Sequence, residues 1–458
     1  MLRNPVLRSP ELLLPAGSLA KMEAAFDYGA DAVYAGQPRY SLRARNNEFS
    51  THEVLADGIA RAHQRGKKFF VASNIFAHNA KLKTYVRAMA PVIAMKPDAL
   101  IMADPGLIML VREEWPDMPV HLSVQANAVN WADVKFWQSI GLTRVILSRE
   151  LSLDEIEEIR QRCPDMEIEV FVHGAMCIAY SGRCLLSGYF NHRDANQGAC
   201  TNACRWDYKV HDADEQASGD ISRLPAASMQ QADKALGKAE RSFSALGAMP
   251  RHRRANRPYL LEESERPGEL MPVLEDEHGT YIMNSKDLRA VEHVARLVKI
   301  GIDSLKIEGR TKSRYYAART AQVYRKAIDD AVAERPFDPQ LLGQLQGLAN
   351  RGYTDGFCQR HQPQSYQNYL SGASAHGRSQ YAGDVRSVVD GWAEVEVKNR
   401  FAVGDRLEVI HPSGNVTVTL EHMRALDGSA IAVAPGDGHH VRIALDARFD
   451  QAMLARLL

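Results

Sequence analysis

The chain has 458 residues, enough for two or three domains, and its composition of 45% hydrophobic and 24% charged residues is typical of globular proteins. Lys plus Arg and Asp plus Glu both total 56, which excludes a strongly basic coat for nonspecific nucleic-acid binding. Any RNA contact would therefore come from local basic patches. No apolar run approaches the ~20 residues that span a bilayer, and the start lacks a signal-peptide pattern. These features predict a cytoplasmic protein with reduced thiols and no membrane partner.

Eight short apolar runs recur along the chain, and an amphipathic stretch follows most of them. They lie at residues 11–16, 32–36, 68–74, 99–104, 120–126, 144–150, 167–174 and 304–309. Apolar strands that alternate with helices indicate a parallel sheet covered on both faces. Eight such units favour an α/β fold, a TIM-like (β/α) barrel over residues 8–340, over an open doubly wound sheet. A further candidate strand at 280–283 leaves the count open.

The seventh and eighth runs are separated by a long insertion, near residues 175–285. It begins with a group of cysteines and continues into a polar stretch near 211–258 whose composition predicts flexibility. A compact basic run lies at 250–258. It fits a solvated loop and an RNA-phosphate contact equally well.

The pattern changes after a linker at 341–378. Short alternating strands are expected at 384–389, 392–397, 405–410 and 415–421, separated by turn residues. They predict a small antiparallel β-barrel domain over residues 379–446. Such domains bind nucleic acid in some proteins and serve as packing modules in others.

Four cysteines within the insertion are candidate metal ligands: Cys177, Cys184, Cys200 and Cys204. Four thiolates suit either an iron–sulfur cluster or zinc. Zinc sites usually show two tight cysteine pairs, so the wider C-x6-C-x15-C-x3-C spacing favours a cluster, although spacing alone leaves zinc and unliganded thiols open. The first cysteine follows the seventh strand closely, which places the group at the carboxyl end of the barrel. Cys163 and Cys358 are expected to be ordinary thiols, with Cys358 as an alternative ligand.

Polar side chains at the strand ends form the predicted pocket. They are Asn74, Asp104, Gln125, Asn127, Arg149, Glu150, His173, Glu308 and Arg310. Arginines recur in and near this set, and because arginine grips carboxylates and phosphates with two parallel bonds, an anionic substrate is favoured. The catalytic candidates are His173, Arg149 and Glu308. The substrate-binding candidates are Asn74, Gln125, Arg310, Arg39 and Arg43. His173 fits a proton donor, a partner of the cluster, or a satisfied buried histidine.

One stretch carries a resemblance to a known family. Residues 169–187 hold Glu169, Phe171, Gly174, Cys177, Gly182, Cys184 and Ser187 at the family's spacing, and 28–43, 121–130 and 304–310 support the match. The chain resembles the collagenase-like peptidase family, whose catalytic type is unknown. The resemblance covers most of residues 10–210 and 275–445. No nucleophile elbow or zinc-binding helix accompanies it.

The resemblance implies a function in tRNA modification. It implies hydroxylation of wobble uridine to 5-hydroxyuridine with prephenate as co-substrate, and a [4Fe–4S] cluster on Cys177, Cys184, Cys200 and a fourth ligand, here Cys204. RNA phosphates are then expected at 251–257 and at Lys306, Arg310, Lys312 and Arg314. Tyr34, Tyr40 or Tyr180 is expected to stack on a flipped base. The alternatives are a metal- or thiol-dependent peptidase and a nonenzymatic RNA-binding or assembly subunit.

Overall fold

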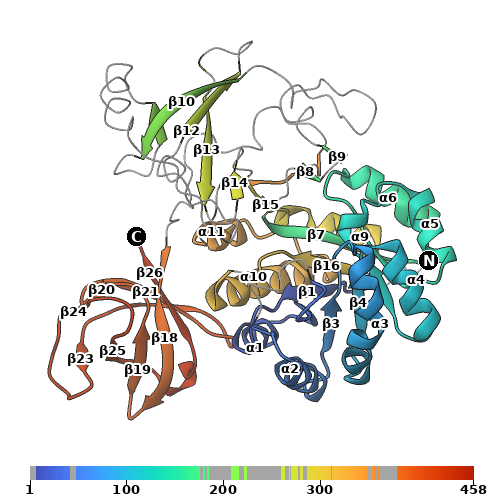
Figure 1. Cartoon of the computed structure of the whole chain (residues 1–458). Helices are drawn as coiled ribbons and strands as arrows, with labels where there is room; N and C mark the ends of the chain where they lie inside the picture. Colours follow the sequence, from blue (N-terminus) through green and yellow to red (C-terminus); the bar gives the residue numbers. More distant parts are fainter. Residues whose placement is uncertain are drawn as a thin grey trace, which may run out of the picture.

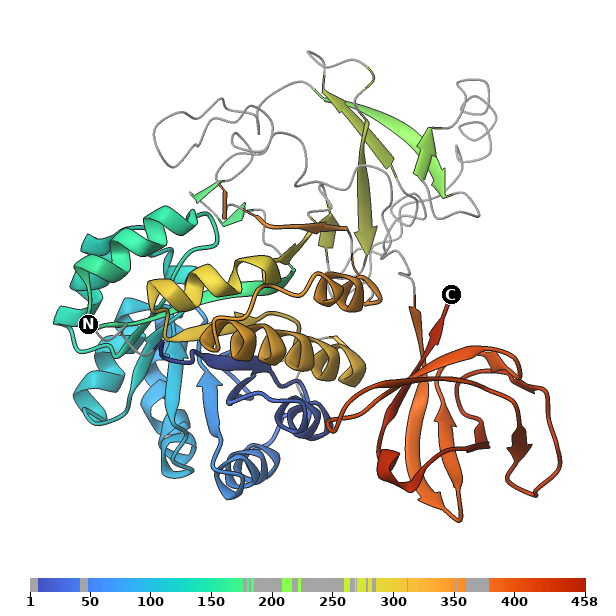
Figure 2. The same ribbon diagram turned by 180° about the vertical axis from the view of Figure 1, so that it is seen from behind.

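The structure is a computed structural model of the whole chain. It describes residues 7–41, 48–175, 179–180, 183–184, 208–215, 221–223, 259–263, 268, 270–276, 279–281, 286–310, 312–348, 350, 352–356, 358–359 and 379–458. Figure 1 shows helices gathered around a central set of strands, with a separate group of strands at the carboxyl end of the chain. Figure 2 shows the same arrangement from behind.

Eight parallel strands form a closed barrel. They are β1 (Glu11–Pro15), β2 (Ala32–Gly36), β3 (Lys68–Ala72), β4 (Ala99–Met102), β5 (Val120–Leu122), β6 (Arg144–Ile146), β7 (Glu167–Ala175) and β16 (Ser304–Ile307). Neighbours pair in chain order, and β16 closes the ring by pairing with both β7 and β1. The predicted TIM-like barrel is confirmed, because each of the eight predicted runs overlaps one of its strands.

Helices cover the outside of the barrel. They are α1 (Leu19–Asp27), α2 (His52–Gln64), α3 (Asn79–Ala94), α4 (Pro105–Glu114), α5 (Trp131–Ser139), α6 (Leu153–Arg162), α9 (Val294–Ile300) and α10 (Arg314–Val332). Side-chain caps fix several helix starts. At α6, Ser152 and Glu155 form the reciprocal capping box.

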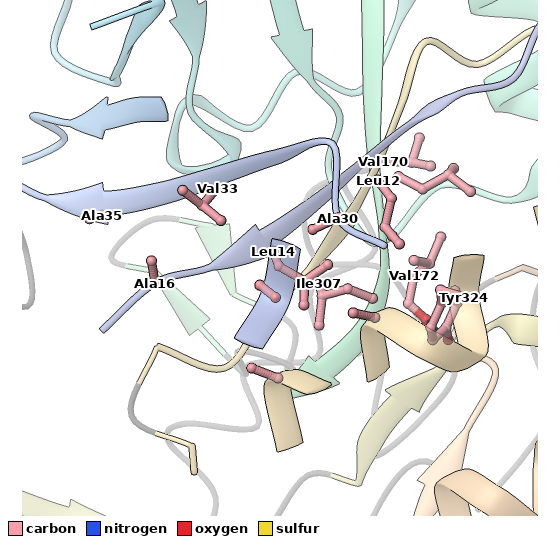
Figure 3. Packing of buried hydrophobic residues seen from close by; sticks show 14 of the residues in the cluster. Leu12, Leu14, Ala16, Ala30, Val33, Ala35, Val170, Val172, Ile307 and Tyr324 are labelled. Carbon is pink, nitrogen blue, oxygen red and sulfur yellow. Dashed lines mark hydrogen bonds between the residues drawn. The ribbon is translucent and has the colours of Figure 1, made fainter. Parts of the chain in front are cut away.

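Strand alternation sorts side chains to the two sides of the barrel wall. Leu12, Leu14 and Ile307 face the helices and pack with Tyr324 of α10 in the layer between strands and helices (Figure 3). Their strand neighbours face inward, where an apolar group fills part of the interior. Its buried members are Leu13, Ala32, Tyr34, Phe70, Ala72, Ala99, Ile101 and Ile146. The barrel interior is therefore a packed core, and charged inward-facing residues must find partners there.

The sequence did not predict several elements that extend the barrel. Strand β15 (Asp287–Arg289) pairs antiparallel with β7 and parallel with β17 (Tyr353–Thr354). Helix α11 (Gln340–Gln346) buries Leu341 and Leu345 against the main core. Residues 341–346 and 353–354, which the sequence assigned to a linker, thus lie in a helix and a strand of the barrel body.

The insertion contains regular structure of its own. Strands β10 (Tyr208–Glu215), β11 (Ile221–Arg223), β12 (Tyr259–Glu263), β13 (Leu270–Asp276) and β14 (Gly279–Tyr281) form an antiparallel sheet, and β8 (Ala179–Tyr180) pairs with β9 (Arg183–Cys184). Two strands of this sheet reach into the stretch at 211–258 for which flexibility was predicted. The candidate strand near 280 belongs to this sheet, so the barrel count stays at eight. The basic run at 250–258 lies outside the described residues.

The carboxyl-terminal strands form the predicted antiparallel domain. The main sheet has the order β22-β21-β26-β18-β19-β25-β23, and β20 pairs separately with β24. The strands are β18 (Ser379–Val389), β19 (Trp392–Val397), β20 (Phe401–Ala402), β21 (Arg406–Ile410), β22 (Val416–Thr419), β23 (Met423–Ala425), β24 (Val433–Ala434), β25 (His440–Ala444) and β26 (Met453–Leu457). The sheet continues past residue 446, because β26 lies between β18 and β21.

This domain packs on the barrel through one side. Ile410 of β21 and Met453 of β26 are buried in the same core cluster as the barrel helices. The Tyr28 hydroxyl donates to the Ile410 carbonyl oxygen at 2.9 Å, and Arg314 lies 2.9 Å from Asp384. In the described part of the chain, no helix combines the length and apolar character that crossing a membrane requires.

Candidate active site at the barrel mouth

A network of buried charges lies inside the barrel, toward the amino ends of the strands. Glu169 is fully buried between two cations, 3.0 Å from Arg144 and 2.8 Å from Lys306. Arg144 also lies 2.6 Å from Glu11. These four residues, Glu11, Arg144, Glu169 and Lys306, are called the lower network below. Because each charge has an opposite charge at contact distance, the network offsets the desolvation that burial imposes.

The mouth of the barrel lies above this network, at the carboxyl ends of the strands. Glu308 directly follows β16, and one of its carboxylate oxygens accepts from the Tyr34 hydroxyl at 3.0 Å and from the Gly309 amide. Arg310 donates to the Ser41 hydroxyl at 3.1 Å. Tyr34, Glu308 and Arg310 are each less than a tenth exposed. The structure therefore brings a fixed carboxylate and a fixed guanidinium together within one short loop.

Cations and aromatic rings alternate across the mouth. The Arg149 guanidinium lies 4.0 Å from the centre of the Phe171 ring. Lys306 lies 5.5 Å from the same ring and 4.4 Å from the Tyr34 ring, and Arg310 lies 5.9 Å from the Tyr34 ring. Burial lowers the pKa of Lys306 from its ordinary value, and the Glu169 carboxylate opposes that shift. Cation–π attraction strengthens when both partners are desolvated, so the array holds its cations in defined positions.

Residues Tyr34, Ser41, Arg149, Phe171, Glu308 and Arg310 are called the mouth cluster below. A small molecule with carboxylate groups would meet two guanidinium groups here, beside a carboxylate that already accepts hydrogen bonds. The arrangement can therefore bind and orient an anion and hold a proton acceptor next to it. Ser41 and Phe171 were not predicted as site residues. The sequence did carry a signal for Phe171. Because alternate residues of a strand share one face, Phe171 lies on the same face of β7 as Glu167 and Glu169.

The end of β7 lies close to the backbone that follows β16, because β7 carries a glycine at that point. Gly174 of β7 has a φ of +104°, a conformation that favours glycine. A Cβ atom at this position would lie 2.3 Å from the backbone oxygen of Glu308. Any side chain at Gly174 would thus push against the backbone that positions Glu308.

His173 does not join the mouth cluster. The pairing of β7 with β16 shifts register between Lys306 and Ile307, so that one residue of β7 bulges out. Such a bulge re-aims a side chain, and the His173 ring faces outward, with ring centroids 5.5 Å from Tyr324 and 5.4 Å from Tyr353.

Burial keeps this histidine neutral. Burial, together with Arg289 and Lys312, lowers the pKa of His173 to about 3. Its Nε2 atom has no hydrogen-bond partner among the described residues. The structure therefore separates the His173 ring from Arg149 and Glu308, the two other residues predicted as catalytic.

The remaining substrate-binding candidates are spread around the mouth. Asn74 donates to the Gln125 side-chain oxygen at 2.6 Å, so these two predicted residues meet each other. Asp104 caps α4 by accepting from the Gly106 amide at 2.8 Å. Arg39 is exposed in the turn after β2. Arg43 lies outside the described residues.

Two of the basic residues expected to contact RNA phosphates, Lys306 and Arg310, are buried. Lys306 is 3% exposed and belongs to the lower network, so it cannot reach an RNA phosphate. Arg310 is 8% exposed, and Arg314 pairs with Asp384 of the carboxyl-terminal domain.

The tyrosines expected to stack on a base have partners within the protein. The Tyr34 hydroxyl donates to Glu308, and Tyr40 packs edge-on against Tyr85 with ring centroids 4.9 Å apart. Nothing is described of the Tyr180 side chain.

The predicted cluster ligands fall almost wholly outside the described residues. Cys177, Cys200 and Cys204 are not described, and Cys184 is described only as part of β9. Among the described residues, no group of three or more His, Cys, Asp or Glu side chains could hold a metal ion. Burial raises the pKa of the Cys358 thiol to about 12, which favours a protonated thiol over a metal-binding thiolate at that position.

Comparison with known proteins assigns the chain to a family. The model of peptidase family U32 matches residues 17–368, and that of the U32 carboxyl-terminal domain matches 377–456. The chain belongs to peptidase family U32, in agreement with the resemblance seen in the sequence. The two matches cover both the barrel and the antiparallel domain.

Two relatives match this chain over nearly the whole length of both sequences, and a third matches over part of its length. The chain is 60% identical to tRNA hydroxylation protein P of Escherichia coli, over 98% of this chain and 96% of the relative. It is 56% identical to tRNA hydroxylation protein P of Haemophilus influenzae over the same shares. It is 30% identical to the 23S rRNA 5-hydroxycytidine C2501 synthase of Escherichia coli, over 71% of this chain and 40% of that protein.

Proposed function

We propose that this chain is an RNA-hydroxylating enzyme that acts on tRNA and converts wobble uridine to 5-hydroxyuridine with prephenate as co-substrate. The observation that carries the proposal is the 60% identity to tRNA hydroxylation protein P of Escherichia coli along nearly the whole of both chains. The mouth cluster supports it, because prephenate carries two carboxylates and the mouth presents Arg149 and Arg310.

The residues of the mouth have distinct tasks in this proposal. Arg310, fixed by Ser41, and Arg149, stacked on Phe171, bind and orient the carboxylates of prephenate. Glu308 holds its carboxylate still through the Tyr34 hydroxyl and serves as the proton acceptor nearest to the bound anion. Lys306 lies beneath both aromatic rings and adds positive charge to the floor of the mouth.

The proposal includes a [4Fe–4S] cluster on Cys177, Cys184, Cys200 and Cys204. The donor set fits, because thiolates are the usual ligands of such clusters and the group follows β7 at the carboxyl end of the barrel. When bound, the cluster supplies one-electron transfer. The four cysteine thiolates would hold it beside the mouth where the substrates are proposed to bind.

The test is mass spectrometry of tRNA nucleosides from cells that lack this chain and any oxygen-dependent uridine hydroxylase. Wild-type chain should restore 5-hydroxyuridine derivatives, whereas Cys200→Ala and Arg310→Ala should not. Arg448→Ala, on an exposed arginine of the carboxyl-terminal domain, is the matched control and should restore them fully. An unchanged nucleoside profile with wild-type chain would reject the proposal.

Experiments on the purified chain distinguish the proposed function from its two alternatives, a peptidase and an assembly subunit. Casein cleavage by the purified chain, lost on substitution of one cysteine, would favour the peptidase that the family name suggests. Binding of tRNA without product, until a second protein is added, would favour an assembly subunit. Product formed by the purified chain with prephenate and tRNA excludes both.

A further inference from the structure

The outer face of the carboxyl-terminal sheet presents two arginines directly opposite each other. Arg424 of β23 pairs across the strands with Arg442 of β25. Alternation turns both side chains outward, because their neighbours Met423 and Ile443 are buried in the core of the domain. Like charges at directly opposed positions of a sheet destabilise it, so this pair needs a compensating partner.

A tryptophan completes the surface. Trp392 of β19 is partly exposed, and the Arg424 guanidinium lies 4.2 Å from the centre of its ring. Neither guanidinium forms an ion pair or side-chain hydrogen bond with a described residue. Glu394, which pairs with Arg442 across β19 and β25, is instead 3.1 Å from His440. Trp392, Arg424 and Arg442 are called the arginine–tryptophan patch below.

The rest of the domain makes this patch distinctive. Residues 379–458 contain eight Lys or Arg against eleven Asp or Glu, so the domain as a whole repels a polyanion. Arg448 is also stacked on an aromatic ring, 4.5 Å from the centre of Phe449, but it lies 3.9 Å from Asp446. The patch therefore combines stacking with positive charge that no described carboxylate neutralises by contact.

The position of the patch leaves it accessible. Strands β21 and β26 pack on the barrel, whereas β23 is the opposite edge of the same sheet. In Figure 1, β23 and β25 lie on the side of the domain away from the barrel, and Figure 2 agrees. A ligand that reaches both the patch and the barrel mouth must be long.

We propose that the arginine–tryptophan patch binds RNA, a second segment of the tRNA whose uridine enters the barrel mouth. This inference rests on the proposed function. One unpaired base stacks against Trp392 and the Arg424 plane, and Arg442 pairs with an adjacent phosphate. Stacking on aromatic and guanidinium planes is the usual way in which proteins hold unpaired bases, and arginine matches the geometry of phosphate.

The test is the affinity of unmodified tRNA for the full chain, measured by fluorescence anisotropy at several salt concentrations. Combined Arg424→Ala and Arg442→Ala substitutions should weaken binding about 10- to 100-fold and lower the salt slope by about one, because Arg442 is the charge that pairs with a phosphate. Trp392→Ala should weaken binding by about 10-fold and leave the salt slope unchanged, because stacking releases no counterions. Arg448→Ala should bind as wild type does.

The outcomes separate this proposal from the proposed function. Wild-type affinity in all patch variants, with unchanged thermal unfolding, overturns the patch. Equal displacement of tRNA by polyglutamate would also overturn it, in favour of an acidic protein partner. Patch-dependent tRNA binding without any 5-hydroxyuridine product supports the patch and rejects the proposed function. With both correct, the patch variants raise the KM for tRNA about 10-fold or more and leave kcat unchanged.

Discussion

The lower network and the mouth cluster are two layers of one barrel that use similar residues differently. Lys306 and Glu308 are two positions apart on and after β16, so both are placed toward the barrel interior. Lys306 lies inside the strand and is paired with Glu169 at 2.8 Å. Glu308 lies just past the strand end and accepts from Tyr34. In this fold, residues at the carboxyl ends of strands form sites, whereas those deeper in the barrel maintain it. Charge in the lower layer should thus govern stability, and charge in the upper layer should govern activity.

The largest effect should follow from breaking the lower network at its centre. Glu169→Ala removes the partner of both Arg144 and Lys306, and leaves two buried cations without that carboxylate. We expect a loss of about 3–5 kcal/mol in the free energy of unfolding. Urea unfolding followed by circular dichroism measures it. Lys306→Met should lower the free energy of unfolding by less, because Glu169 keeps its ion pair with Arg144. Wild-type stability of Glu169→Ala would show that the network does not hold the barrel.

The next effect concerns the mouth and should appear in activity. Arg310→Lys keeps the charge but loses the planar fork that matches a carboxylate. We expect the efficiency of prephenate use, kcat/KM, to fall about 100-fold, which is about 2.7 kcal/mol, with the thermal midpoint nearly unchanged. Arg39→Ala, at an exposed turn residue, is the matched variant and tests the wider set of predicted ligands. An equal loss at Arg39 would extend the site along the loop after β2.

The sequence predicted the barrel well and its additions poorly, for a physical reason. Buried parallel strands such as β3 and β4 need nearly continuous apolar runs, which stand out in a sequence. Strand β15, Asp287-Leu288-Arg289, has a single apolar residue, and it exists because it pairs with the end of β7. Strand β10 is largely polar, so its composition suggested a flexible segment. Pairing partners far away in the chain decide such strands.

The same limit applies to the candidate site. Glu308 and Arg310 could be placed at the mouth because position after a strand is a local property. The contact of Glu308 with Tyr34 joins residues 274 positions apart, and no local pattern reveals it. His173 was expected beside Arg149 because both lie at strand ends, which converge on one pocket in a barrel. A one-residue bulge between β7 and β16 turns it toward α10 instead.

The buried His173 predicts how the stability of the protein depends on pH. Its folded pKa of about 3 lies below its ordinary value near 6.5, so the unfolded chain binds the proton more readily. Its contribution to stability is present above about pH 6.5 and is lost as the pH falls toward 3, with a slope of at most about 1.4 kcal/mol per pH unit.

His173→Gln should therefore flatten the dependence of the thermal midpoint on pH between 7 and 4.5. His121, which is also buried with a lowered pKa, remains in the variant and keeps part of the slope. Identical slopes in both proteins would contradict a buried neutral His173. If the substitution changed the pH profile of activity but not the dependence of the thermal midpoint on pH, His173 would instead act as an acid or base in the reaction.

The smallest effect tests where the lower network ends. Lys68 lies 2.9 Å from Glu11 at the amino end of the barrel, but its side chain is 54% exposed, whereas that of Arg144 is 3% exposed. Water screens the outer pair, so Lys68→Ala should cost between about 0.2 and 1 kcal/mol. The difference should vanish in 1 M salt, where the screening length is about 3 Å. Thermal unfolding of wild type and variant at low and high salt measures it. A loss as large as that of Glu169→Ala, and insensitive to salt, would mean that the network acts as one unit out to the surface, and that depth in the barrel does not set the value of its charges.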